Sequence, residues 1–442
     1  MPAPITNGPP TSREQPTMTE LETLNFFTDQ TLVADPYPYM EAMRSGCPVR
    51  REPHHNVMVV TGYDEALAVF GDAENFSSCT AVTGPFPGFP MPLEGRPEQE
   101  IAELIDKHRA ELPFSDQVTV MDPPTHTAHR ALLMGLITPK RLKENEEFMW
   151  NHNDKVLDPY LAGGSGEYIK GFAAPFTLAV IADLLGVPLE DRAEFAKRMD
   201  HSQGGIGGTD EGSLSHSPLE YLYEKFSAYI EDRRREPRPD ALTEMANATF
   251  PDGSTPEVMD VVRIAANLYT AGQETTVRLL SSALMVLAER PDVQDVLRKE
   301  PGKIANFVEE MLRIESPVKG DFRLARKTMT IGGVEIPAGT TVMVMNGAAN
   351  RDPRQFENPD VLDVDRSNAR RHIAFGRGVH SCPGSPLARA EAKVALDRLL
   401  SRTTAIRLSE EHHGPEGARR FQYVPTFILR GLTALHLEFD LA

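Results

Sequence analysis

One cysteine of the chain stands in a stretch whose residue types and spacing suit metal binding. Cys382 follows Gly376 and Gly378 and precedes Pro383, and a helical pattern begins directly after it. The free N–H groups and the dipole at the start of a helix stabilise a thiolate placed there. The two glycines allow a tight loop that lies flat against a planar group, and proline suits the first helical position. The stretch predicts a thiolate presented to a metal in a planar cofactor.

Two other interpretations of Cys382 start from the same residues. With His380 it could belong to a zinc site, but Cys47 and Cys79 offer no second ligand pair with zinc spacing. His380 could also act as the base for a nucleophilic cysteine. Neither interpretation accounts for three further motifs, which lie in a long helix and in two shorter ones.

The long helix is predicted over residues 254–289, with Pro256 at its first helical position. Such a helix is long enough to cross a whole domain. Gly272 and Thr275 in its middle are poor helix formers. A threonine hydroxyl that bonds to a backbone carbonyl, next to a glycine, can open the helical hydrogen-bond ladder. We therefore predict a local opening within the run Ala271-Gly272-Gln273-Glu274-Thr275-Thr276.

The two shorter motifs are pairs of charged residues at helical spacing. His126 and Arg130 follow Asp122-Pro123-Pro124 and share one helix face at i,i+4, which suits binding of carboxylates. Taken alone, such a pair is more often solvated or paired with an acid. Glu310 and Arg313, at i,i+3, are by themselves a weak signal, because exposed pairs of this kind are common and contribute little.

The composition limits the classes of function. The chain has 442 residues, of which 40% are hydrophobic, and a net charge of −18, which argues against binding to nucleic acid or to an anionic membrane. Three cysteines at unrelated spacings imply no disulfide framework and favour a reducing compartment. Residues 1–16 are polar and proline-rich, so we expect a disordered tail without a leader or anchor. We expect residues 17–442 to form a single domain of a cytoplasmic protein.

Together the motifs resemble the cytochrome P450 family of haem-thiolate proteins, in its soluble bacterial, ferredoxin-dependent type. Residues 375–384 match its F-G-x-G-x-H-x-C-x-G signature, and the other motifs stand in the family's order. The resemblance implies a mainly α fold with a smaller β region, whose long central helix crosses over the haem. It also implies iron protoporphyrin IX, haem b, as the cofactor.

The resemblance assigns roles to individual residues. Cys382 would bind the iron, Thr275 would hydrogen bond to iron-bound dioxygen, and Glu274 would supply protons. Glu310 and Arg313 would form a buried structural pair; Val361 stands where the family usually has a third partner, an arginine, which Arg366 or His372 could replace. Four basic residues would bind the haem propionates and four others would lie against the haem: His126, Arg130, Arg323 and His380, and Ala271, Phe375, Gly376 and Gly384.

The implied activity is that of a monooxygenase that hydroxylates a lipophilic small molecule, such as a terpenoid, a steroid or a fatty-acid-like chain. Electrons would come from a separate ferredoxin and its NAD(P)H-dependent reductase, with docking near Arg370, Arg371 and Arg377, and the protein would be a monomer. Residues 204–208, with four glycines, predict a mobile lid between two roof helices. The candidates for the substrate pocket are Phe86, Phe89, Asn267, Thr270, Val318, Phe322 and Ile428.

Two other functions are compatible with a haem-thiolate protein. A peroxide-driven enzyme would need no redox partner, but such relatives tend to lose the acid–alcohol pair that Glu274 and Thr275 form here. A non-catalytic haem carrier or gas sensor would not need that pair either, and sensors usually carry a signalling domain.

Overall fold

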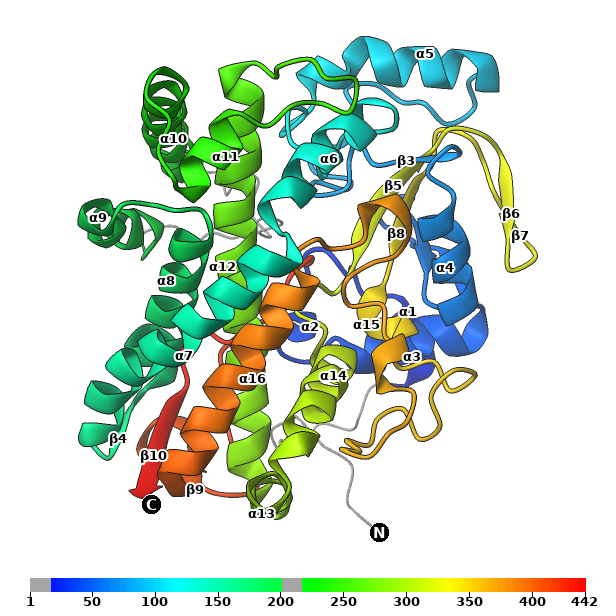
Figure 1. Ribbon diagram of the computed structural model, residues 1–442. Coiled ribbons are helices and arrows are strands. Elements are labelled where there is room, and N and C mark those ends of the chain that lie inside the picture. The colour runs from blue at the N-terminus through cyan, green and yellow to red at the C-terminus, as the bar shows by residue number, and fades with distance from the viewer. Residues whose placement is uncertain (1–16, 201–216) are drawn as a thin grey trace.

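The computed structural model describes residues 17–200 and 217–442 of the chain. Two predictions concern residues outside these ranges, namely the disordered tail at 1–16 and the glycine-rich lid at 204–208. The described residues form a mostly helical molecule with a smaller β region on one side (Figure 1). This arrangement confirms the predicted fold class.

Helices carry most of the described chain, and several begin where the sequence offers a cap. Thr138, for example, accepts a hydrogen bond of 3.3 Å from the backbone N–H of Arg141 at the start of α7. Among the described helices, none is both long and apolar enough to cross a membrane. The bounds are α1 Met18–Glu22, α2 Thr31–Ala34, α3 Tyr37–Gly46, α4 Tyr63–Gly71, α5 Glu98–His108, α6 Thr125–Leu136, α7 Pro139–Ala162, α8 Ala174–Leu184, α9 Leu189–Asp200, α10 Ser217–Arg235, α11 Ala241–Ala246, α12 Val258–Glu289, α13 Pro291–Lys299, α14 Ile304–Glu315, α15 Asn346–Ala349, α16 Ser385–Arg402 and α17 Glu410–His413.

The strands of the described ranges form three sheets. The largest has the order β1-β2-β8-β5-β3, in which β2 runs parallel to β8 and the other neighbours are antiparallel. The second sheet has the order β4-β10-β9, and β6 and β7 form a hairpin. The bounds are β1 Val49–Arg51, β2 Met58–Val60, β3 Phe76–Ser77, β4 Ser165–Glu167, β5 Asp321–Ala325, β6 Met329–Ile331, β7 Val334–Ile336, β8 Thr341–Val344, β9 Thr403–Leu408 and β10 His436–Leu441.

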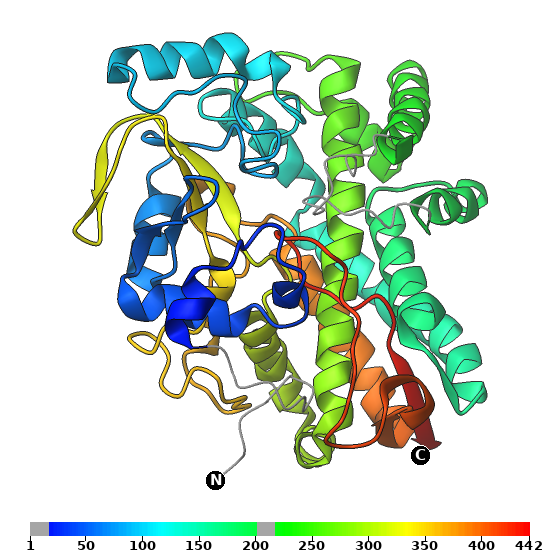
Figure 2. The same ribbon diagram turned by 180° about the vertical axis from the view of Figure 1, so that it is seen from behind.

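The long helix α12 passes through the middle of the molecule (Figures 1 and 2). Its 32 residues span about 48 Å, and α8, α10, α14 and α16 pack against it. Every side chain over 276–287 is buried, polar ones such as Arg278 included, because neighbouring elements cover this part of the helix. The helix begins later than predicted: Glu257, in a capping box with Asp260, caps it, and Pro256 lies outside.

One local prediction, for the residue after Cys382, is corrected. Helix α16 begins at Ser385, so Pro383 precedes the helix instead of occupying its first position. The segment around residues 427–431 turns back on itself like a hairpin: Tyr423 and Leu432 form an antiparallel bridge, and the Val424 N–H donates to the Gly431 carbonyl at 3.0 Å. A second isolated bridge, between Val318 and Leu429, joins this segment to the chain after α14.

The hydrophobic core places the cysteine loop where the helical and β parts of the molecule meet. One large cluster surrounds α12 and includes the inner faces of α7, α8, α14 and α16. A second cluster packs α4 against the largest sheet. The loop before α16 runs between these two clusters (Figure 1) and includes Ile373 of the second and Ala374 of the first. Cys382 is therefore held between α12 and the sheet.

Candidate active site

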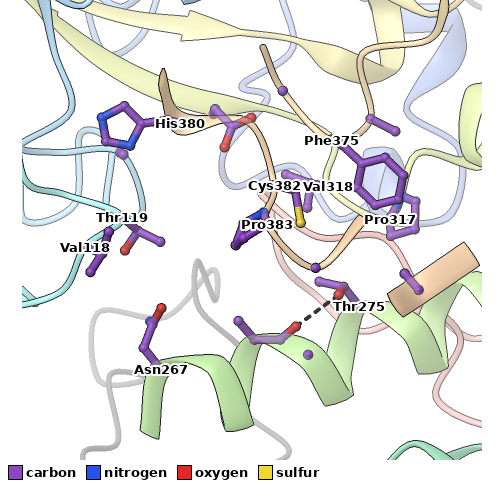
Figure 3. Close-up of a pocket in the computed structure, with 18 of the residues that line it drawn as sticks. Val118, Thr119, Asn267, Thr275, Pro317, Val318, Phe375, His380, Cys382 and Pro383 are labelled. Atoms are coloured by element: carbon purple, nitrogen blue, oxygen red, sulfur yellow. Dashed lines mark hydrogen bonds between the residues drawn. The ribbon is translucent and has the colours of Figure 1, made fainter. Parts of the chain in front are cut away.

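A cavity of about 270 Å³ lies between α12 and the loop that carries Cys382. Figure 3 shows the sulfur of Cys382 on one side of this space and Thr275 of α12 on the other. The walls come from segments that are far apart in the chain. The predicted site residues that line the cavity are His126, Arg130, Asn267, Ala271, Thr275, Val318, Arg323, Phe375, Gly376, His380, Cys382 and Gly384.

The loop that presents Cys382 depends on backbone contacts. The Cys382 N–H donates to the Phe375 carbonyl at 2.8 Å. Gly378 has a φ of 72°, and a Cβ there would overlap the carbonyl oxygen of Phe70, so a glycine is required. Burial raises the pKa of the Cys382 thiol, and the N–H groups at the start of α16, at Gly384 and Ser385, act against this shift.

Basic side chains gather on the cavity wall beside the cysteine loop. The rings of His126 and His380 lie with their centroids 4.0 Å apart. Both nitrogens of His126 and Nε2 of His380 are buried without a hydrogen-bond partner among the described residues. Burial lowers the pKa of both rings, that of His380 to about 3. Arg130 donates to the Ser381 carbonyl, and Arg323 donates to the Phe322 carbonyl at 2.6 Å.

This donor set fits haem. Buried nitrogens without partners need acceptors, and the carboxylates of haem propionates supply them on the same wall as Arg130 and Arg323. A cysteine sulfur at the start of a helix supplies a thiolate for the iron. Gly376, at φ 63°, lines the cavity and has no protein atom within 4 Å of where its Cβ would be, which leaves open space on that side of the loop.

The middle of α12 differs from its prediction in one respect. The Thr275 hydroxyl donates to the Ala271 carbonyl at 3.0 Å, as predicted (Figure 3). The α-helix nevertheless continues through this point without interruption. Glu274 does not line the cavity with Thr275; it lines a smaller pocket behind α12, where it accepts a hydrogen bond from Arg278.

The predicted pair Glu310 and Arg313 is fully buried. Arg313 donates to both carboxylate oxygens of Glu310, at 2.7 and 3.0 Å. The third partner is Arg366, whose Nε lies 3.1 Å from Glu310. Val361 still takes part, because its backbone carbonyl accepts from both arginines, at 3.3 and 3.0 Å. The network thus ties α14 to the segment that leads to Cys382.

His372, the other candidate third partner, belongs to a neighbouring network that the sequence did not reveal. Its Nε2 lies 2.9 Å from Glu309, and Arg389 of α16 donates to the same carboxylate at 2.7 and 3.0 Å. These hydrogen bonds lower the pKa of Glu309 to about 2 despite its burial. The Arg389 guanidinium also lies 4.7 Å from the centre of the Phe375 ring. Glu309 therefore supports, through Arg389, the Phe375 ring that lines the cavity.

Five predicted substrate residues lie away from the cavity wall. Phe86, Phe322 and Ile428 share one hydrophobic cluster on the other side of the largest sheet. Phe89 packs against His108, and the Thr270 hydroxyl donates to the Ala266 carbonyl of its own helix at 3.1 Å. These five residues are not among those that line the cavity; the four apolar side chains pack in neighbouring clusters, and the Thr270 hydroxyl bonds to its own helix.

Other wall residues were missed by the sequence prediction. Leu268 and Gly272 could have been found, because they share a helix face with Ala271 and Thr275. The remaining residues come from loops and neighbouring helices that only the fold brings together. They include Phe70, Ala81, Val82, Val118, Thr119, Leu133, Pro317 and Asp321, whereas Leu279 lies on α12 one turn after Thr275 and could also have been found.

Comparisons with known proteins agree with this site. A family model described as cytochrome P450 matches residues 216–412. Cytochrome P450 144 of Mycobacterium tuberculosis is 32% identical, over 95% of this chain and 92% of that protein. The 6-deoxyerythronolide B hydroxylase of Saccharopolyspora erythraea is 31% identical, over 96% of this chain and 99% of that protein. The structure of Mycobacterium marinum cytochrome P450 CYP150A6, in its substrate-free form, is 52% identical, with a TM-score of 0.89, and the match covers 96% of this chain and 100% of that chain.

The fold and the site define a haem-thiolate enzyme. The chain belongs to the cytochrome P450 monooxygenase family, whose members bind haem b.

Proposed function

We propose that residues 17–442 form a single haem domain that hydroxylates a lipophilic small molecule, such as a terpenoid, a steroid or a fatty-acid-like chain. A separate ferredoxin and its NAD(P)H-dependent reductase supply the electrons. One observation carries the proposal: the sulfur of Cys382 and the hydroxyl of Thr275 line one cavity from two sides. A sulfur that can bind iron and a hydroxyl that can handle a proton thus face the same space.

The residues present divide the work of holding the cofactor. Cys382 would bind the iron as a thiolate, and His126, Arg130, Arg323 and His380 would bind the propionates. When bound, haem with two electrons and two protons supplies dioxygen activation, by which one oxygen atom enters a C–H bond and the other leaves as water.

Side chains of α12 would handle the protons of this reaction. Thr275 can turn its Oγ1 hydrogen from the Ala271 carbonyl into the cavity and donate there. Glu274, about 100° around the helix from Thr275, faces the pocket behind α12 and can take a proton at its carboxylate from that side. The two residues are adjacent in sequence, so the helix itself separates the proton source from the reacting space.

The outer surface of the cysteine loop supports docking of an acidic ferredoxin. Arg371 and Arg377 are exposed, the Arg370 side chain is 76% exposed, and Val379 of the same loop is 46% exposed. Basic residues around an exposed apolar residue suit a negatively charged partner, although the whole chain carries a charge of −18. The site lies directly outside Cys382, so an electron would travel a short path.

The proposed class of substrate is inferred from the side chains that line the cavity. Beyond the residues that would hold the haem, most side chains there are apolar, among them Val82, Val118, Leu133, Leu268 and Val318. Such a wall favours a lipophilic molecule.

Turnover of the purified haem protein tests the proposal. We expect a product that contains one oxygen atom from dioxygen when ferredoxin, reductase and NAD(P)H are present, and much less product with peroxide alone. The carbon monoxide complex of the reduced protein should show the red-shifted Soret band of a thiolate ligand, and Cys382→Ala should abolish it. Equal turnover with peroxide alone would favour a peroxide-driven enzyme, and a thiolate band without turnover of any lipophilic compound would favour a carrier or sensor.

A further inference from the structure

The cavity wall holds a single carboxamide among its described residues. Asn267 lies on α12 two turns before Thr275 (Figure 3), which corresponds to about 12 Å along the helix axis. The basic residues of the wall face the propionate positions, and Asp321 accepts a hydrogen bond of 2.8 Å from Asn346. Asn267 therefore stands apart from the other strongly polar groups, among Val118, Leu268 and other apolar neighbours.

A chain of hydrogen bonds fixes the orientation of this amide. Asn267 Nδ2 donates to Oε1 of Gln117, a residue only 7% exposed in the loop before α6. Gln117 also hydrogen bonds to the hydroxyl of Tyr223 on α10. One turn earlier on α12, Arg263 pairs with Asp116 at 2.8 Å, which holds the same loop against the helix. The amide of Asn267 is thus held by Gln117, whose own position is fixed by Tyr223 and by the Arg263–Asp116 pair.

These contacts leave part of the amide free. The Asn267 side chain makes no further hydrogen bond to a described residue, so Oδ1 and the second N–H of Nδ2 remain. Figure 3 shows the amide directed from the helix toward the cavity. The free groups are one acceptor and one donor side by side.

We propose that Asn267 binds a hydroxyl group of the substrate, and that the substrates are lipophilic alcohols oxidised on a carbon on the order of 10 Å from that hydroxyl. This proposal rests on the monooxygenase function proposed above. A hydroxyl both donates and accepts, so it satisfies both free groups of the amide. A hydrocarbon that displaces water from the cavity would leave these two groups of the partly buried amide without a partner, which is costly.

The same geometry sets the length and charge of the ligand. The distance along α12 between Asn267 and Thr275 sets the length of the substrate. The molecule must reach from Asn267 to the space between Thr275 and Cys382. A long-chain alcohol or a polycyclic alcohol spans it, whereas a compact monocyclic alcohol does not. Among the described residues next to Asn267 on the wall there is no cation, so a carboxylate has no charged partner at that end.

Binding of two matched pairs of compounds tests whether Asn267 anchors the hydroxyl group of the substrate; this proposed contact is called the anchor below. The pairs are dodecan-1-ol with dodecane and androstan-3-ol with androstane, titrated into the purified haem protein while the spin-state shift of the haem spectrum is followed. We expect at least one alcohol to bind roughly tenfold more tightly than its hydrocarbon, the gain of about one well-formed hydrogen-bonded pair.

Three variants locate the effect. Leucine is similar in size to asparagine but cannot hydrogen bond. Asn267→Leu should therefore bind the alcohol about as tightly as its hydrocarbon, and its affinity for the hydrocarbon should be unchanged or higher. Gln117→Leu frees the amide to rotate and should reduce the preference in part, so Gln117 is a positioning residue. Thr270→Val is the matched control, because the Thr270 hydroxyl is bonded to its own helix, and it should keep the full preference.

The anchor is wrong if no alcohol binds more tightly than its hydrocarbon, or if Asn267→Leu keeps the wild-type preference. A second readout distinguishes loss of the hydrogen bond from altered packing, namely the position at which a bound alcohol is oxidised. The wild type should oxidise it at one position, and Asn267→Leu at several. The proposed function is judged separately, by the thiolate band of the carbon monoxide complex and by oxygen incorporation. An enzyme that passes those two tests but shows no preference for alcohols would refute only the anchor.

Discussion

Arg278 donates to the carboxylate of Glu274 one turn earlier on α12, on the side of the helix that faces away from Cys382. The Arg278 side chain is 6% exposed, and its Nε and Nη1 have no partner among the described residues. Buried donors beside a small pocket favour bound water. The carboxylate that we propose as the proton source therefore faces a polar space behind the helix.

Glu274→Gln should slow product formation by on the order of 10- to 100-fold, since a glutamine keeps the contact with Arg278 but cannot carry a proton. The measurement is the rate of product formation with ferredoxin and reductase, together with its solvent isotope effect, which should rise. Gln273→Ala, in the same pocket, is the control and should change neither. An unchanged rate in Glu274→Gln would remove the carboxylate from the proton path.

Thr275→Ala should separate electron consumption from product formation. Without the Oγ1 hydroxyl the cavity has no proton donor at this position, so NAD(P)H oxidation should continue while more of the oxygen leaves as hydrogen peroxide. The ratio of product to NAD(P)H consumed measures the effect, and Thr270→Ala is the control on the same helix. If Thr275→Ala keeps the wild-type ratio, its hydroxyl has no part in the reaction.

Arg366→Met should destabilise the fold by about 3–5 kcal/mol, because it removes one of the two cations around the fully buried Glu310. Arg370→Met should cost less than about 1 kcal/mol, since that side chain is 76% exposed. Urea unfolding of the haem protein gives both values. Equal costs for the two substitutions would show that Arg366 is not the third member of the buried pair.

Gly378→Ala and Gly376→Ala form a matched comparison within the cysteine loop. Both glycines have a positive φ, of 72° and 63°, so both substitutions add strain of about 1 kcal/mol. A Cβ at Gly378 also overlaps the Phe70 carbonyl, whereas a Cβ at Gly376 meets no protein atom within 4 Å. Gly378→Ala should therefore lower the free energy of unfolding by about 1–3 kcal/mol more than Gly376→Ala. The reverse order would contradict the loop geometry.

Glu391 of α16 should make the stability depend on pH. Burial raises its pKa to about 8 from 4.5, and only a hydrogen bond with Thr276 of α12 opposes the shift. The folded protein thus binds a proton that the unfolded chain releases near pH 4.5. The contribution of Glu391 to stability is full below pH 4.5 and is lost as the pH rises to about 8, a change of a few kcal/mol.

Glu391→Gln should remove this dependence, because an amide stays neutral throughout. The thermal midpoint of the variant should exceed that of the wild type at pH 8 and approach it at pH 5. Glu103→Gln, at an exposed position of α5, should follow the wild type at both values. A Glu391→Gln variant with the wild-type pH profile would contradict the neutral carboxyl.

The sequence predicted those parts of the site that local patterns encode. Cys382, the His126–Arg130 pair and Thr275 sit in short motifs whose spacing carries their geometry, and the structure brings them to one cavity. The contact of Asn267 with Gln117 joins residues 150 positions apart, and no local pattern encodes such a pair. Phe86 and Phe89 were predicted as pocket residues from the family resemblance of their loop, yet packing against neighbouring apolar clusters decides their place.

Helix geometry also limits what a motif reveals. Glu274 and Thr275 are adjacent in the chain, but successive residues of a helix differ by about 100° in direction. The motif therefore predicted both residues but did not show that they face two different spaces. The prediction of Pro383 as the first helical residue was wrong because the sequence offers two prolines. Pro386, three residues later, suits the first turn equally well and is the one that lies in it.

Val361 shows how a buried ion-pair network can tolerate substitution at one of its positions. Arg313 and Arg366 both bond to the Val361 carbonyl, an atom that every amino acid has. Substitution at 361 therefore leaves that acceptor in place. The second cation of the network is supplied by Arg366 instead of by residue 361. A homologue that lacks the expected arginine has not necessarily lost the network, since the path of the backbone can be inherited when the side chain is not.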